Sequence, residues 1–110
     1  MLNYEISGKG NENLVMLHGF MENLMIWEDL EARLSNDFTL IKIDLPGHGL
    51  SKMYAEIHSM ELMAEEVKKV TDQLGLKNFH LLGHSMGGFV LQRYLEMYPH
   101  DLPAGVVLMA

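Results

Sequence analysis

The 110-residue sequence predicts a three-layer α/β fold, in which helices cover both faces of a mainly parallel sheet. Short apolar runs of strand length, at 14–18, 79–83 and 104–110, alternate with longer segments whose apolar residues recur at helical spacing. These runs lack the polar alternation of a one-sided sheet, which is typical of strands buried on both faces. Strands that alternate with helices form right-handed βαβ units, and we expect residues 1–110 to form a single domain.

The first half of the chain predicts three strands and one helix. Apolar and polar residues alternate over 2–6, which indicates a half-buried strand, and the run 14–18 is the first fully buried strand. A helix is predicted over 26–34 and another buried strand over 38–44. The apolar face of that helix is expected to consist of Ile26, Trp27, Leu30 and Leu34.

The second half predicts two helices and two strands. Ser59 has the residue type of a helix N-cap, and apolar residues recur at helical spacing over 60–74. A buried strand follows over 79–83, then a second helix over 86–98 and a last apolar strand over 104–110. The elements therefore alternate to the end of the chain.

Composition and charge exclude several classes of protein. The formal net charge of −7 argues against a nucleic-acid surface, since Lys and Arg must neutralise phosphates there. The absence of cysteine excludes disulfides, thiolate metal sites and a cysteine nucleophile. No apolar stretch reaches the ~18 residues that span a membrane, and the N-terminus lacks the basic start and apolar core of a secretory signal. We therefore expect a cytoplasmic protein with no membrane partner.

A serine lies between glycines where a predicted strand gives way to a helix. Residues 83–87, GHSMG, match the pattern G-x-S-x-G in the strand–turn–helix setting that it requires. Such a turn lifts the Ser85 hydroxyl to the carboxyl end of the sheet, where backbone N–H groups can stabilise a developing oxyanion. The Met86 N–H is the first expected donor. The second is the Phe20 N–H, because Gly19 lets the loop after the first buried strand approach closely.

Four motifs together resemble the α/β-hydrolase superfamily, in particular its small esterase-like and acyl-transfer members. They occur in the family's order and spacing, and they are LHGF at 17–20, Trp27, DLPGHGLS at 44–51 and GHSMGG at 83–88. By this resemblance Ser85 is the nucleophile, and the Phe20 and Met86 N–H groups form the oxyanion hole. The implied substrate is a small molecule with an ester or thioester group, and no metal or organic cofactor is implied.

Residues close to these motifs are candidates for a substrate pocket. Met21 and Met25 follow the HGF motif and are candidate walls of an acyl pocket, since pockets are apolar and lined by loops. His18 either lines this pocket or fixes the loop by a hydrogen bond, and His84 either lines it or packs against its neighbours. Trp27 is expected to anchor the core. The candidate pocket residues are His18, Gly19, Met21, Met25 and His84.

The histidines of the chain do not supply an obvious base for the serine. In this family the acid and the base follow the nucleophile, and only His100 with the adjacent Asp101 does so here. The helix after Ser85 carries both residues roughly 20 Å away, to the opposite edge of the sheet. His48 with Asp44 remains an alternative pair at the correct edge, although turn geometry also explains both residues.

The resemblance implies that residues 1–110 are the N-terminal part of a longer hydrolase. Relatives continue into a helical lid and two further strands whose ends bear the acid and the base, and their first strand precedes the one at 2–6. We therefore expect the acid and base beyond residue 110, and negligible ester hydrolysis by this fragment above a Ser85→Ala control. Its last strand would be an open apolar edge, so we expect self-association through 105–110 unless another chain covers it.

Other functions remain open at this point. A lyase or acyl-transfer enzyme of the same fold carries the same motifs, and a non-catalytic module that binds a ligand or assembles with a complementary piece needs no base. A metal site is not predicted, because His80 and His84 are four apart on a strand rather than on a helix. A nucleotide site is not predicted either, since neither glycine-rich phosphate-binding pattern is present.

Overall fold

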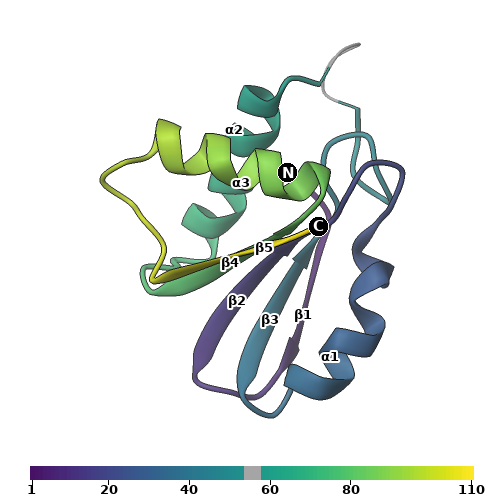
Figure 1. The fold of residues 1–110 in the computed structure, drawn as a ribbon, viewed down its shortest axis with the longest axis vertical. Helices are drawn as coiled ribbons and strands as arrows, with labels where there is room; N and C mark the ends of the chain where they lie inside the picture. The colour runs from purple at the N-terminus through teal and green to yellow at the C-terminus, as the bar shows by residue number, and fades with distance from the viewer. Residues whose placement is uncertain (54–57) are drawn as a thin grey trace.

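The computed structural model describes residues 1–53 and 58–110, which form one five-stranded sheet with helices on both faces (Figure 1). The strands are β1 (Tyr4–Gly8), β2 (Glu12–Leu17), β3 (Phe38–Ile43), β4 (Phe79–His84) and β5 (Gly105–Met109). The helices are the 3-10 helix η1 (Leu24–Trp27), α1 (Glu28–Leu34), α2 (Met60–Gln73) and α3 (Met86–Met97). The spatial order of the strands is β1-β3-β2-β4-β5.

The sheet is mainly parallel, as the sequence predicts. Strands β3, β2, β4 and β5 run parallel to one another, and only β1 is antiparallel to its neighbour β3. The register pairs Leu17 at the end of β2 with Ile43 in β3 and with Gly83 in β4. The carboxyl ends of the three central strands therefore meet at one edge of the sheet, which we call the carboxyl edge. The opposite edge, where these strands begin, is called the amino edge.

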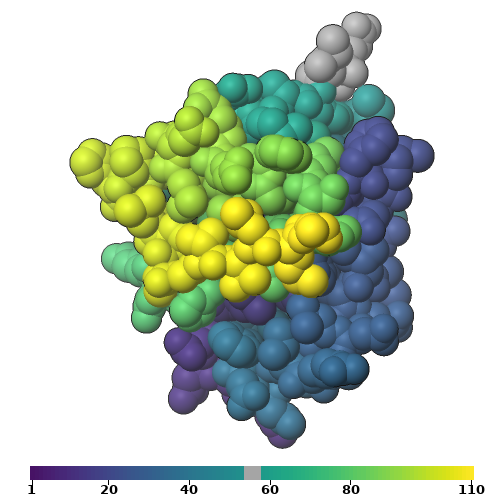
Figure 2. Space-filling model, viewed as in Figure 1, coloured from purple at the N-terminus to yellow at the C-terminus, as the bar shows by residue number. Residues whose placement is uncertain are grey.

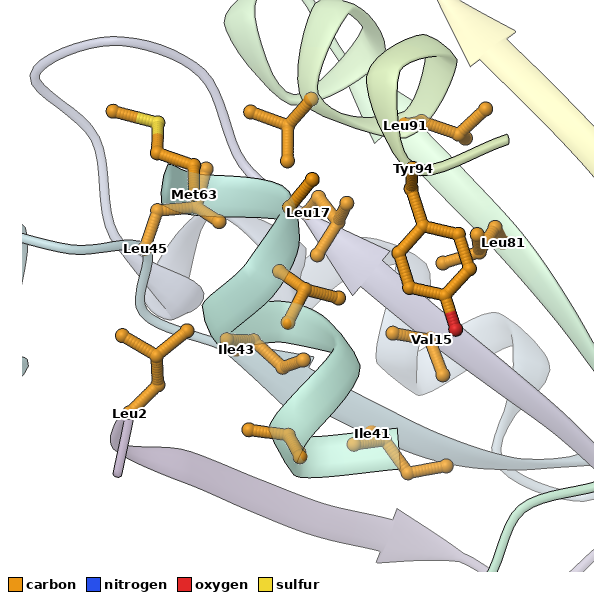
Figure 3. Packing of buried hydrophobic residues seen from close by; sticks show 14 of the residues in the cluster. Leu2, Val15, Leu17, Ile41, Ile43, Leu45, Met63, Leu81, Leu91 and Tyr94 are labelled. Atoms are coloured by element: carbon orange, nitrogen blue, oxygen red, sulfur yellow. The ribbon is translucent and has the colours of Figure 1, made fainter. Parts of the chain in front are cut away.

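Two apolar clusters hold the layers together, one on each face of the sheet. Helices α2 and α3 cover one face, where Tyr94 of α3 and Met63 of α2 pack over Val15 and Ile43 of the strands (Figures 1 and 3). On the other face Trp27 packs with a second set of strand residues, to which α1 adds partly buried leucines. That second set consists of Leu14, Met16, Leu40 and Leu82.

The helix predicted at 26–34 differs in detail from the observed one. Its first turn is the 3-10 helix η1, which begins at Leu24 because the Asn23 side chain accepts a hydrogen bond from the Met25 N–H. This shift buries Leu24 and Trp27, whereas Ile26 is 38% exposed and does not belong to the apolar face. The prediction for Ile26 was wrong, and the prediction that Trp27 anchors the core is confirmed.

The longest helix, α2, begins where the sequence predicts. Ser59 is its N-cap and accepts a hydrogen bond from the Leu62 N–H at 3.1 Å. Val67 and Val70 on its inner face are fully buried against the sheet. Among the described residues, no helix combines the length and apolar character needed to cross a membrane.

Strand β5 lies at the end of the sheet and is exposed. It pairs with β4 on one side only, and its four apolar residues from Val106 to Met109 are 41–56% exposed. Figure 2 shows this segment as a continuous yellow strip across the surface between α3 and the first third of the chain. The predicted position of residues 104–110 at a sheet edge is confirmed.

Candidate active site

The turn between β4 and α3 places Ser85 at the carboxyl edge in a strained conformation. Strand β4 ends at His84 and α3 begins at Met86, so Ser85 alone makes the turn, with φ 53° and ψ −115°. A positive φ costs a residue other than glycine free energy, and such strain is common at functional sites. The Ser85 side chain is exposed and makes no capping hydrogen bond to the helix. Its hydroxyl therefore stands free at the end of a central strand.

Two glycines allow this turn to pack tightly. A Cβ on Gly83 would lie 2.5 Å from the carbonyl oxygen of Gly87, and one on Gly87 would lie 2.2 Å from that of Leu17. Neither distance is compatible with a side chain. The glycines of the G-x-S-x-G pattern therefore bring α3 against β4 and against the end of the neighbouring strand β2.

The same contacts bring the loop after β2 beside the serine turn. An added Cβ on Gly87 would lie 2.6 Å from the His18 carbonyl oxygen, and one on Gly19 would lie 3.3 Å from that of His84. Thus the segment that leads to Phe20 and the segment that leads to Ser85 are in van der Waals contact. The side chain of Phe20 points outward and is largely exposed.

His18 is fully buried and ties two loops together. Its Nε2 atom accepts a hydrogen bond from the Leu45 N–H at 3.0 Å, so the proton is on Nδ1, which lies 2.7 Å from the Gly19 carbonyl oxygen. Burial lowers the pKa of His18 below its ordinary value of 6.5, and it outweighs the opposing effect of the bond to Gly19. The ring is therefore a neutral brace between the loops after β2 and β3.

Asp44 organises the carboxyl edge without pairing with His48. Its buried carboxylate accepts hydrogen bonds from the Asn3 side chain at 2.9 Å and from the backbone N–H groups of Leu24 and Leu50 at 2.8 and 3.0 Å. It thereby joins the N-terminus, the start of η1 and the loop after β3. A Cβ on Gly49, which has a positive φ of 53°, would lie 2.3 Å from the carboxylate.

His48 forms its hydrogen bonds with residues other than Asp44. Its Nε2 atom accepts from the Met21 N–H at 3.1 Å, and its Nδ1 lies 3.1 Å from the Pro46 carbonyl oxygen. Both ring nitrogens are thus engaged, and the ring packs 5.1 Å from that of His18. The alternative in which His48 and Asp44 act as a substitute pair is therefore wrong for this structure, because each residue shapes a loop instead.

Glu22 is a residue of the site that the sequence analysis missed. One carboxylate oxygen, Oε1, accepts a hydrogen bond from the Gly19 N–H at 2.8 Å and lies 3.1 Å from the Nδ1 atom of His84. Burial raises the pKa of Glu22, but the bonds from Gly19 and His84 outweigh it and hold the pKa below the ordinary value of 4.5. The only sequence signal was a carboxylate three residues after Gly19 in a tight loop. The rings of His84 and Trp27 are roughly perpendicular, with 6.5 Å between their centroids.

The two methionines of the candidate pocket lie in different surroundings. Met21 is highly exposed and has a positive φ of 63° in the loop beside Ser85. Met25 borders a cavity of about 120 Å³ next to α1, whose other walls include Glu28 and Lys42. Large apolar side chains that are exposed at the carboxyl edge include Phe20, Met21, Leu50, Met53 and Phe89.

His100 and Asp101 lie at the amino edge, as the sequence predicts. Together with Lys68, Tyr94 and the first residue of β4, Phe79, they line a cavity of about 440 Å³. The length of β4 separates this cavity from Ser85, which is roughly 20 Å at about 3.3 Å per residue. These residues are therefore outside the reach of the serine.

The two histidines of β4 bind different carboxylates. His80 Nε2 lies 3.2 Å from Glu12 Oε1, whereas His84 faces Glu22 near the other end of the strand. Within residues 1–53 and 58–110, no group of three His, Asp or Glu side chains is arranged to hold a metal ion.

A family model for the alpha/beta hydrolase fold matches residues 12–110 of the chain. The chain belongs to the α/β-hydrolase family. This α/β-hydrolase chain is 37% identical over 107 residues to a pimeloyl-[acyl-carrier protein] methyl ester esterase of Sodalis glossinidius, a match that covers 97% of the chain and 39% of that protein.

Two further relatives agree with this assignment. A serine hydrolase-like protein of Danio rerio is 33% identical over 97 residues, covering 86% of the chain and 30% of that protein. The solved structure of a thermophilic esterase from Thermogutta terrifontis superposes with a TM-score of 0.90 at 31% identity, covering 97% of the chain and 39% of the esterase. The α/β-hydrolase chain thus spans about two fifths or less of the length of these relatives.

Proposed function

We propose that this chain carries the nucleophile of a serine hydrolase that cleaves carboxylic esters. One observation carries the proposal. Ser85 stands exposed and strained at the carboxyl end of a central strand, and its turn contacts the loop 18–21. A hydroxyl in this setting can reach a substrate carbonyl while backbone N–H groups approach from both sides. The similarity to an esterase and to a methyl ester esterase supports an ester as the substrate class.

In the proposed reaction the Ser85 hydroxyl attacks the ester carbonyl carbon. A histidine takes the hydroxyl proton, and the carbonyl oxygen becomes an oxyanion. The tetrahedral intermediate collapses to an acyl-serine, and the alcohol leaves with the proton that the histidine returns. Water then attacks the acyl-serine by the same route and releases the acid.

The Phe20 and Met86 N–H groups are proposed to hold the oxyanion. Met86 is the first residue of α3, so its N–H has no partner within the helix. In the part of the chain that the structure describes, the Phe20 N–H donates no hydrogen bond. Both donors are therefore available to a ligand, and the positive end of the helix dipole adds to their effect.

The base and its acid are proposed to come from outside residues 1–110. His18 and His48 have both ring nitrogens engaged, and His100 lies at the amino edge. A base must come within about 3 Å of the serine hydroxyl, directly or through one water. A histidine carried by another part of the full-length protein meets this requirement without disturbing the hydrogen bonds of His18 and His48.

The test is turnover and covalent labelling in the natural full-length protein. We expect hydrolysis of p-nitrophenyl butyrate and labelling by a fluorophosphonate, both lost in Ser85→Ala, with turnover lower by at least about 10³-fold because no nucleophile remains. Ser35→Ala, at the end of α1, is the matched control and should keep both. Turnover and labelling that persist in Ser85→Ala would overturn the proposal.

A further inference from the structure

We propose that Glu22 is a positioning residue that sets the separation of the two oxyanion donors, an inference that rests on the proposed function of Ser85. The Glu22 side chain joins the two backbone segments from which these donors come. Its Oε1 atom accepts from the Gly19 N–H at 2.8 Å and lies 3.1 Å from Nδ1 of His84. Glu22 itself does not act on the substrate.

The two partners of Glu22, Gly19 and His84, lie next to the proposed oxyanion donors in the sequence. Gly19 immediately precedes Phe20, whose N–H is the proposed donor from the loop after β2. His84 immediately precedes Ser85 and is two residues before Met86, whose N–H is the other donor. One carboxylate oxygen therefore fixes both segments one or two residues from the atoms that must face the oxyanion.

The surroundings favour an ionised and well-ordered Glu22. A Cβ on Gly19 would lie 2.6 Å from Oε1, so glycine is what allows the carboxylate to approach the backbone N–H this closely. The groups that face the carboxylate are the Gly19 N–H, the His84 ring and, at longer range, the His18 ring. The His84 ring also packs roughly perpendicular to the buried Trp27 ring, which limits its movement.

Other contacts maintain the fold when Glu22 is replaced. The replacement should therefore change the positions of the two donor N–H groups and leave the fold unchanged. The close contact of Gly87 with the end of β2 does not involve Glu22, nor does the brace from His18 to Leu45. Loss of the carboxylate leaves the loop in place but frees the Gly19 N–H. Because the donors act on the oxyanion and only weakly on the ground-state ester, the loss should lower kcat and leave KM nearly unchanged.

The first experiment observes the hydrogen bond directly by NMR. In the wild-type protein the Gly19 amide proton should lie downfield and move upfield as Glu22 is protonated, with an apparent pKa below 4.5. Glu22→Ala should move this resonance upfield at pH 7, and Glu65→Ala, an exposed glutamate of α2, should not. A Gly19 resonance that is the same in Glu22→Ala as in the wild type would overturn the proposal.

The second experiment measures kinetics of the natural full-length protein with p-nitrophenyl butyrate. Glu22→Ala should lower kcat by about 10- to 100-fold, the scale of a 1 Å misplacement, with KM within about 2-fold. Glu22→Gln keeps an oxygen that accepts from the Gly19 N–H and should recover most of the loss. Wild-type kcat in Glu22→Ala, alongside turnover that depends on Ser85, would overturn the positioning role alone. Turnover that survives Ser85→Ala would overturn the proposed function and this inference together.

Discussion

The two edges of the sheet are built in different ways, although the same strands run between them. At the carboxyl edge, buried side chains such as His18 and Asp44 bind backbone N–H groups, and glycines let separate segments touch. At the amino edge, the segments after α2 and α3 enclose a cavity of about 440 Å³. Glycines bring backbone segments together at the amino edge as well, because a Cβ on Gly10 would lie 2.0 Å from the Asp37 backbone. The difference is that buried side chains bind the loop backbone at the carboxyl edge, whereas a cavity lies at the amino edge.

The ion pairs of Lys68 at the amino edge involve carboxylates at the surface. Lys68 lies 3.2 Å from Asp101, pairs also with Asp72, and sits 5.4 Å from the centre of the Tyr98 ring. Both carboxylates are more than 60% exposed, so each pair contributes at most about 1 kcal/mol to stability. The comparison shows that buried side chains hold the loops at the carboxyl edge through hydrogen bonds to backbone N–H groups, whereas Lys68 at the amino edge pairs with exposed carboxylates.

A pair of glycine substitutions compares the close contact of Gly87 at the carboxyl edge with the open surroundings of Gly75 beside the amino-edge cavity. Gly87→Ala places a Cβ 2.2 Å from the backbone of β2, so α3 or β2 must move, and we expect a loss of about 4 kcal/mol in the free energy of unfolding. Gly75→Ala, which borders the amino-edge cavity, has a positive φ of 66° but nothing within 4 Å of the new atom. It should cost only about 1 kcal/mol. Urea unfolding measures both, and equal losses would contradict the comparison.

A pair of aspartate substitutions compares the buried carboxylate of Asp44 at the carboxyl edge with the exposed carboxylate of Asp101 at the amino edge. Asp44→Ala leaves the N–H groups of Leu24 and Leu50 and the Asn3 side chain without their acceptor, and we expect a loss of about 3 kcal/mol. Asp101→Ala removes an exposed partner of Lys68 and should change stability by less than about 0.5 kcal/mol. Thermal unfolding of the two variants gives the measurement. A small effect of Asp44→Ala would mean that water replaces the carboxylate and that the edge is less rigid than its contacts indicate.

The features that the sequence predicted are those with a local signal. The strand–turn–helix pattern around Ser85 and the apolar runs of the strands depend on neighbouring residues, and they were placed within two residues of their observed bounds. Ile26 was misplaced because the capping bond of Asn23 starts the helical turn earlier than the apolar spacing alone suggests.

The features that the sequence did not predict depend on contacts between distant parts of the chain. Asn3 binds Asp44 across 41 residues, and Glu22 binds His84 across 62. No periodicity or spacing along the chain encodes such contacts. Even so, Asp44, His84 and their loops were singled out by their motifs, and only their partners required the structure. Motifs therefore mark where a site lies, and tertiary contacts decide what each of its residues does.

The smallest expected effect is the pH dependence of stability that comes from His18. Its pKa is lowered in the folded protein, so the unfolded chain binds more protons between that pKa and 6.5. The stability that the neutral ring contributes is thus fully present above 6.5 and is lost as the pH falls toward the folded value. The urea midpoint of the wild type should therefore decrease from pH 7 to pH 5 more steeply than that of His18→Gln, whose amide can still accept from the Leu45 N–H. A slope unchanged in His18→Gln would show that the carboxyl edge does not need a neutral histidine.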